Sequence, residues 1–234
     1  MTRAQAGSGN ADRRDSPVSR DQIVATAMRI GDEETLEALT MRRLASEVGL
    51  GTMTLYGYFK NKDELLDAMA DDVLGTMEFD VPSDAPVDEV VRSLALAFLQ
   101  TFRSHPSVVR VLTTRTTTSH RAMLGAYERA LERLVQSGLS PAAAVHVYGL
   151  TITYALGFAS YARPRPWGDG RADEPGAREL RASRSEFYGS LPAQDFPIMR
   201  ALREDLVNLP SLEQFSWGLD VLVAGMVATS AAAE

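Results

Sequence analysis

Apolar residues recur every three to four positions along most of the chain, which is the spacing of amphipathic helices. Ile23, Ala27 and Ile30 form one such stripe. It predicts a helix that begins after Ser19 and ends near residues 32–34. Ser19 and Gln22 have the spacing of a capping box, in which each side chain satisfies a backbone N–H group of the first turn. Shorter helices are expected over 40–48 and 52–58, and a longer one from Lys62 onward.

The same period continues through the rest of the chain. The helices predicted there are 86–104, 120–138, 141–162, 197–206 and one that begins after Ser211. Gly138 is a typical stop signal, and Ser140 followed by Pro141 is a typical start. Residues 163–196 are rich in Arg, Gly, Asp and Glu and are expected to form a mobile, solvated connection. Neither a strand pattern nor a repeat is present, so the predicted fold class is all-α.

Composition narrows the classes of function. The chain has 234 residues, of which 45% are hydrophobic, a formal net charge of −7 and no cysteine. Such an apolar content is too high for a disordered chain. The lack of cysteine excludes a disulfide scaffold, a thiol nucleophile and cysteine-bound zinc or iron–sulfur sites. The first twenty residues lack the apolar run of a secretory signal, which favours a cytoplasmic protein. The acidic total argues against coating nucleic acid without sequence preference, but not against local basic contacts.

The segment 141–162 is long and uncharged enough to span a bilayer. It nevertheless contains His146, Thr151 and three tyrosines, and no cluster of positive charge flanks one side. A helix that is apolar all round is buried either in lipid or between protein surfaces. These features favour burial in protein, and no membrane attachment is expected.

The segment from Met41 to Leu55 has the spacing of a helix-turn-helix. The small residue Ala45 lets two helices approach each other, and Gly49 can take the positive φ of a sharp turn. Leu44, Leu50 and Leu55 fill the small core between the helices. The second helix then presents its outward side chains to a DNA major groove.

The wider segment Leu39–Met69 resembles the DNA-binding domain of the TetR family of bacterial transcriptional repressors. The residues that carry the resemblance are Thr40, Arg42, Leu44-Ala45, Val48-Gly49, Thr54-Leu55-Tyr56, Tyr58-Phe59, Lys62 and Leu65-Leu66. Residues 1–18 are rich in Gly, Ser, Asp and Arg and are expected to form a flexible arm. The resemblance implies a three-helix DNA-binding domain over 19–66 and a larger helical ligand-binding and dimerisation domain over 67–234.

The resemblance also implies which residues contact double-stranded operator DNA. They are Thr40, Arg42, Thr52, Met53, Thr54, Tyr56, Tyr58 and Lys62. Thr52, Met53 and Thr54 would face the bases, with Met53 against a thymine methyl group. Thr40, Tyr56, Tyr58 and Lys62 would contact the sugar–phosphate backbone, and Arg42 a base edge or a phosphate. Of the two tyrosines, Tyr58 is the one expected to be partly buried. Gly57 departs from the family, which often has a bulkier residue there.

A weaker resemblance to tetracycline-repressor-like C-terminal domains follows. Its carriers are Ser104-His105, Thr114-Arg115, Gly138-Leu139-Ser140, Leu156-Gly157, Phe215, Gly218-Leu219, Leu222 and Gly225. It implies a pocket for a small-molecule effector, and a homodimer in which two helices of each chain pair with the second copy. The segments near 141–162 and 211–229 suit that role, because the former has two apolar stripes and one monomer cannot bury both.

The resemblance places Phe98, Thr114 and Arg115 in the pocket, and helical facing adds Phe102, Tyr127, Tyr154, Phe158 and Tyr161. Each aromatic residue has plain core packing as its alternative role. Tetracycline repressors hold Mg²⁺ through a histidine and an acid, where this chain has Val111 and Tyr161. Their polar drug contacts correspond to Glu78 and Leu94 here. We therefore expect no metal and no other cofactor, and an apolar or aromatic effector in place of a metal–tetracycline complex.

The sequence thus predicts a ligand-responsive, DNA-binding regulator: a repressor released from a palindromic operator by its effector. One alternative is a helical enzyme, and another is a small-molecule-binding protein without DNA-binding activity. The three histidines are far apart in sequence, and no Glu-x-x-His pair, phosphate loop or nucleophile elbow is present. The protein is therefore not expected to be an enzyme.

Overall fold

The structure is a computed structural model that describes residues 18–163, 165 and 176–231. Within these residues every regular element is a helix and no strand occurs, which confirms the all-α prediction. The chain divides after Leu65 into two compact units, one residue before the expected boundary. The proposed arm over 1–18 lies outside the described residues, except for Val18.

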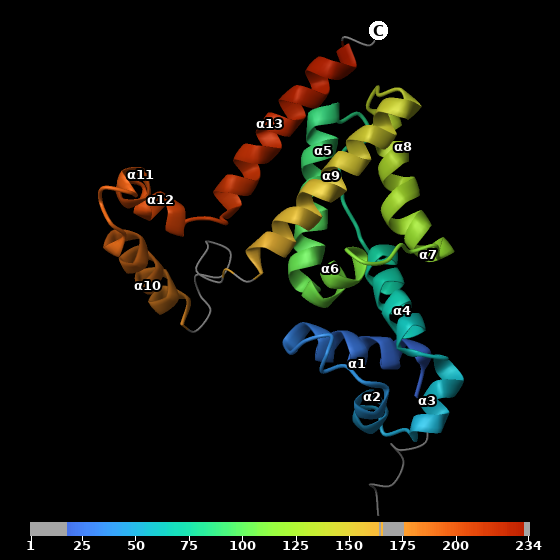
Figure 1. Cartoon of the computed structure of the whole chain (residues 1–234). Helices are drawn as coiled ribbons and strands as arrows, with labels where there is room; N and C mark the ends of the chain where they lie inside the picture. Colours follow the sequence, from blue (N-terminus) through green and yellow to red (C-terminus); the bar gives the residue numbers. More distant parts are fainter. Residues whose placement is uncertain (1–17, 164, 166–175, 232–234) are drawn as a thin grey trace, which may run out of the picture. The chain divides into compact units, whose positions relative to one another are not determined.

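The first unit contains α1 (Arg20–Glu33), α2 (Met41–Glu47), α3 (Thr52–Tyr58) and the first residues of α4 (Lys62–Gly75) (Figure 1). Both bonds of the Ser19 capping box are present. Thr40 begins α2, and its side-chain oxygen accepts a hydrogen bond from the backbone N–H of Arg43. Gly49 has φ of 71°, the left-handed conformation that the sharp turn was expected to need.

A small apolar core holds these short helices in place. Its members are Ile23, Ala27, Ile30, Leu39, Leu44, Leu55, Phe59 and Leu65, each with an exposed fraction of 0%. Asn61 begins α4, because its side-chain oxygen accepts from the backbone N–H of Glu64 at 2.8 Å. Isolated helices of seven residues are unstable in water, so this packing and these caps maintain α2 and α3.

The second unit is built around α5 (Val87–Ser104) and α9 (Pro141–Ala162). Helices α6 (Pro106–Leu112), α8 (Arg129–Gln136) and α13 (Leu212–Ala231) pack against this pair (Figure 1). Ser140 and Pro141 start α9 as expected, and the Ser140 side chain accepts from the N–H of Ala143. Gly138, with φ of 106°, lies in the turn after α8.

The interior of the second unit is aromatic. Phe98 stacks on Phe102, with ring centroids 5.7 Å apart, and meets Tyr148 edge-on at 5.9 Å. Tyr127 lies 4.9 Å from Tyr148. The Tyr148 hydroxyl is buried, and within the part of the chain that the structure describes no group meets the geometry of a hydrogen bond to it. Burial, with a smaller contribution from the neighbouring Tyr127, raises the pKa of this hydroxyl well above its usual range.

One expected connection contains a helix. Residues 163–196 were expected to be mobile and solvated, whereas α10 spans Ala177–Ser190. The segment has few apolar residues, but Ala, Arg, Glu and Leu are strong helix formers. Polar contacts from α11 (Pro197–Ala201) and α12 (Arg203–Val207) stabilise α10. Arg200 donates to the carbonyl oxygen of Leu191 at 2.6 Å, and Ser185 donates to Glu204 at 2.7 Å.

The helix expected over 120–138 is interrupted by a π-helical segment. It consists of α7 (His120–Ala122), η1 (Met123–Glu128) and α8. Gly125 lies in η1 so close to α4 that an added Cβ would be 2.6 Å from the carbonyl oxygen of Leu74. The π-helical turn therefore lies where η1 packs closely against the end of α4.

Candidate functional site

Helix α3 presents most of its side chains outward. Leu55 is its one buried residue, whereas Met53 is 83% exposed and Tyr56 is 41% exposed. Thr54 is exposed and Thr52 is partly exposed. Met53 is the most exposed of the large apolar side chains that the structure describes, so α3 offers apolar contact area to a partner.

The other four predicted DNA contacts lie around α3. Thr40 is exposed while its hydroxyl caps α2, and Arg42 is exposed in the first turn of that helix. The Tyr58 hydroxyl donates to the carbonyl oxygen of Val18 at 2.8 Å. The Lys62 ammonium donates to the carbonyl oxygen of Leu36. Lysine has three N–H donors, so this bond leaves others for a second acceptor.

Two arginines of this unit form ion pairs with glutamates of the same unit. Arg43 donates to Glu34 at 2.7 Å, and Arg29 donates to Glu47 at 2.9 Å and to Glu33 at 3.2 Å. The hydrogen bond from Arg43 holds the pKa of the Glu34 carboxyl below its usual range. These arginines thus balance acids of α1 and α2, and Arg42 and Lys60 are the exposed basic residues next to α3.

The predicted ligand residues of the second unit lie in several places. Phe98 and Phe102 are almost wholly buried, and Tyr127 packs beside Tyr148. Tyr154 stacks on Phe215, with ring centroids 4.9 Å apart, and Phe158 meets Phe215 edge-on at 5.0 Å. Thr114 is exposed, and Arg115 forms an ion pair with Asp67 at 3.1 Å. Tyr161 is 48% exposed and lies under the guanidinium of Arg165. The structure therefore does not gather all eight residues into one pocket.

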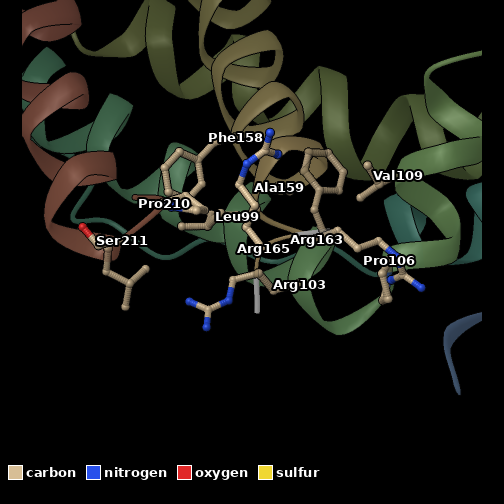
Figure 2. Close-up of a pocket in the computed structure, with 13 residues that line it drawn as sticks. Leu99, Arg103, Pro106, Val109, Phe158, Ala159, Arg163, Arg165, Pro210 and Ser211 are labelled. Atoms are coloured by element: carbon tan, nitrogen blue, oxygen red, sulfur yellow. The ribbon is translucent and has the colours of Figure 1, made fainter. Parts of the chain in front are cut away.

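Two of them, Phe102 and Phe158, line a groove between the C-terminal ends of α5 and α9 and the start of α13 (Figure 2). The groove is small, with a cavity volume of about 50 Å³. Its other lining residues are Leu99, Arg103, Pro106, Val109, Ala159, Ala162, Arg163, Arg165, Pro210, Ser211 and Leu212. The walls are mainly apolar, and the charged side chains among them are three arginines.

Comparison with known proteins identifies the family. Residues 23–69 match the model described as "Bacterial regulatory proteins, tetR family". Residues 83–230 match the model described as "Tetracyclin repressor-like, C-terminal domain", which covers more than half of the chain. The chain belongs to the TetR family.

Individual relatives agree with this assignment. The TetR-family chain is 31% identical over 213 residues to the HTH-type transcriptional repressor DrrR1 of Streptomyces coeruleorubidus, covering 88% of this chain and 76% of the relative. It is 30% identical over 145 residues to the HTH-type transcriptional repressor Rv1353c of Mycobacterium tuberculosis, covering 60% of this chain and 56% of that protein. The crystal structure of Streptomyces coelicolor ActR in complex with actinorhodin has 31% identity and a TM-score of 0.74, and the match covers 92% of this chain and 99% of that one.

A second surface of this TetR-family chain lies between α9 and α13. Its groove is lined by Ser140, Ala142, Ala143, His146, Val147, Leu150, Val221, Leu222, Gly225, Met226 and Thr229. Leu150 is 43% exposed and Val221 is 54% exposed. Helix α9 is apolar and long enough to cross a membrane, but only 33% of its apolar window is buried within the chain. A large part of the surface of α9 thus lacks an apolar neighbour in one copy.

Polar contacts connect α4 to the segment that follows α6. Arg115 pairs with Asp67, Thr117 donates to Asp71, and Arg121 pairs with Asp72 at 2.8 Å. Asp67, a carboxylate of the chain itself, is thus one partner of the Arg115 guanidinium.

The sequence pattern did not single out four residues that the structure makes prominent. They are Tyr148, with its unpartnered hydroxyl, and the three arginines of the groove, Arg103, Arg163 and Arg165. Arg103 is about sixty positions before Arg163, so only the packing of α5 on α9 brings them together. Among the described residues, no three His, Cys, Asp or Glu side chains gather as a metal site would require.

Proposed function

We propose that this TetR-family chain is a homodimeric repressor that leaves a palindromic operator when a small aromatic effector binds its helical domain. The observation that carries the proposal is the outward face of α3, with Met53, Thr54 and Tyr56 exposed on a capped and well-packed unit. Similarity to proteins named as transcriptional repressors, and to ActR with bound actinorhodin, supports it. The proposed role is regulatory and needs no catalytic group, and binding to operator DNA would occur in the cytoplasm.

In this proposal α3 lies in the major groove. Thr52, Met53 and Thr54 face base edges, where the Met53 thioether chain suits a thymine methyl group and the hydroxyls suit polar edges. Thr40, Tyr56 and Tyr58 lie against the backbone, and Arg42 and Lys62 add positive charge beside phosphates. The existing bonds of Tyr58 and Lys62 hold these two side chains in place, which lowers the entropy lost on binding.

The proposed dimer explains the surface between α9 and α13. A second copy related by a two-fold axis would cover Leu150, Val221 and the apolar groove between them with the same residues. The second copy would also bury apolar surface of α9, the helix that is long and apolar enough to cross a membrane. Two-fold symmetry places two copies of α3 on equivalent half-sites of a palindrome.

In this proposal, release from the operator follows from a difference in the effector's affinity for two conformations of the protein. The effector can weaken DNA binding only by as much as it prefers the conformation that does not fit the operator. Helix α4 is the physical connection, since its first residues belong to the DNA-binding unit and its aspartates contact Arg115, Thr117 and Arg121. Effector binding that shifts the segment after α6 would shift α4 with it.

The test uses DNA from beside the protein's own gene. We expect the wild-type dimer to shift a fragment of this region, and Met53→Ala and Thr54→Ala to weaken binding by roughly 10-fold each, because each removes a base contact. Thr116→Ala, an exposed position outside the DNA-binding unit, is the matched control. Undiminished operator affinity in both α3 variants would remove the assignment.

A further inference from the structure

We propose that Trp217 anchors the two-fold dimer by inserting into the groove between α9 and α13 of the second copy, where it lies over Gly225. The inference rests on the proposed function, because it takes a second copy of the chain to be the partner of this surface. It adds the residue that holds the two copies together and the direction in which the two α13 helices pass each other.

The exposed side of α13 is bulky at one end and shallow at the other. Trp217 is 68% exposed, although tryptophan has the largest apolar side chain of all residues. Val221 follows one turn later and is 54% exposed. Beyond it the exposed residues Ala224, Gly225 and Ala228 are small. Residues four apart are neighbours on a helix surface, so a projecting ring and a shallow place share one side of α13.

Packing within one copy does not explain the glycine at position 225. In the part of the chain that the structure describes, an added Cβ on Gly225 would meet nothing within 4 Å. Its φ is not positive, so the backbone does not require glycine either. Glycine weakens the interior of a helix relative to alanine. A large side chain of the second copy in the space over Gly225 gives the glycine a role that one copy alone does not.

The groove beside Gly225 has room for such a side chain. Its cavity volume is about 550 Å³, and most of its lining residues are apolar. Val221 and Gly225 line it from α13, and Leu150 lines it from α9. Two flat helix surfaces would leave this groove empty and so lose van der Waals contacts. A projecting indole ring fills it, and buried tryptophans contribute much of the binding energy at protein interfaces.

Symmetry then sets the direction of the two helices. A two-fold axis makes contacts reciprocal, so if one Trp217 lies over Gly225 of the other copy, the reverse contact also forms. This pairing requires the two copies of α13 to run in opposite directions, with the axis beside Val221, the midpoint between the two positions. Parallel copies would press the two rings against each other and leave a void between the glycines. The antiparallel arrangement places large against small at both ends.

The first experiment measures association of the full-length protein. Sedimentation velocity of fluorescently labelled protein, from about 1 nM to about 10 μM, gives the dissociation constant of the dimer. We expect Trp217→Ala to weaken the dimer by about 100-fold or more, because each dimer then loses two anchors. Leu124→Ala, at an exposed leucine of η1 outside the groove, is the matched control and should keep the wild-type constant. Circular dichroism checks that each variant is folded.

A double-mutant cycle tests the contact with Gly225. Gly225→Leu fills the space over this position from its own copy, so it should weaken the wild-type dimer by about 10-fold or more. In the Trp217→Ala background the leucine enters space that the ring has left, so the same substitution should weaken association little or strengthen it. Gly189→Leu in α10, where a Cβ would meet only the Arg203 side chain at 4.0 Å, is the control.

Single cysteines can report the direction of α13, because the chain has no cysteine of its own. Val221→Cys, beside the axis, should form a disulfide between the two copies under mild oxidation. Ala228→Cys should not. Antiparallel copies separate the two 228 positions by about 21 Å along the helix, whereas a disulfide joins Cα atoms at most about 7 Å apart. Parallel copies would allow both variants to cross-link.

Three results would overturn the inference: a Trp217→Ala dimer as tight as the wild type, an equal loss from Gly225→Leu in both backgrounds, or a disulfide in Ala228→Cys. A dimer that Val221→Glu dissociates and Trp217→Ala does not refutes the anchor alone. A wild-type chain that stays monomeric at every concentration refutes the proposed dimer together with its anchor. Promoter binding judges the repressor separately, because a dimer held by Trp217 that ignores its promoter refutes the repressor alone.

Discussion

At the scale of single residues, Tyr148 places a hydroxyl in the aromatic core without a hydrogen-bond partner. A buried polar group without a partner costs about 1–3 kcal/mol, so Tyr148→Phe should raise the free energy of unfolding by about 1 kcal/mol near neutral pH. Urea unfolding followed by circular dichroism measures the change. Tyr56→Phe, at an exposed tyrosine, is the control and should leave stability unchanged. A clear loss of stability in Tyr148→Phe would show that the hydroxyl has a partner in solution.

The burial of Tyr148 also predicts how the free energy of unfolding changes at high pH. Burial raises the pKa of the Tyr148 hydroxyl above its ordinary value of 10.0. Above about pH 10 the unfolded chain loses this proton while the folded chain keeps it, so the folded state loses stability as the pH rises. Tyr148→Phe should reduce that loss, which urea unfolding at pH 8 and pH 10.5 would reveal. An identical decline in wild type and variant would contradict this assignment.

Gly57 is a glycine inside α3, the proposed DNA-binding helix. An added Cβ would meet nothing within 4 Å, so packing does not require glycine there. Because glycine in a helix costs about 1 kcal/mol relative to alanine, Gly57→Ala should stabilise the DNA-binding unit by about that amount. Thermal unfolding measures stability, and operator affinity shows whether the DNA backbone needs the space. A destabilised Gly57→Ala protein would mean that the helix has another shape in solution.

At the scale of elements, local signals in the sequence predicted helix starts and turns well. Ser19, Thr40 and Ser140 cap helices where expected, and Gly49 has the positive φ of the turn. Helix caps and tight turns depend on residues within about four positions of one another, so they can be recognised from the sequence alone. Helix α10 and the π turn were missed, because distant contacts produce them. Arg200 and Glu204 bind α10 from α11 and α12, and η1 fits around Leu74 and Gly75.

The contact between α9 and α13 depends on a glycine. An added Cβ on Gly218 would be 2.3 Å from the Tyr154 hydroxyl, which donates to the carbonyl oxygen of Phe215 at 2.8 Å. Gly218→Ala should therefore destabilise the second unit by about 1–3 kcal/mol, the usual cost of overpacking. Tyr154→Phe removes the clashing oxygen, so the double variant should recover part of the loss. Gly189→Ala in α10, where a Cβ would meet only the Arg203 side chain at 4.0 Å, is the control. Equal stability of both alanine variants would show that α13 lies farther from α9.

At the scale of the whole molecule, the sequence predicted the family and the outward face of α3, but not the groove lined by Phe102 and Phe158. The residues of α3 are contiguous, and one helical period decides which of them face outward. The groove is lined by Arg103, Phe158 and Pro210, which come from three segments that are far apart in the sequence. The periodicity of one segment cannot show that it packs beside the other two. Helical facing did identify Phe102 and Phe158 as candidates, because each points inward from its own helix.

The two-fold assembly is the prediction that belongs to this largest scale. Val221→Glu places a carboxylate at an exposed position beside the groove between α9 and α13, so the single chain should still fold. In the proposed dimer the axis brings two such charges to the interface, and their desolvation and repulsion should weaken association by about 100-fold or more. Sedimentation velocity over a range of protein concentrations measures this. Val135→Glu, at an exposed valine on α8, provides the matched control.

Loss of the dimer should also remove cooperative binding to the full palindrome, whereas affinity for a half-site should stay the same, because α3 is unchanged. If Val221→Glu sediments as the wild-type dimer does, the interface lies on another face of the molecule.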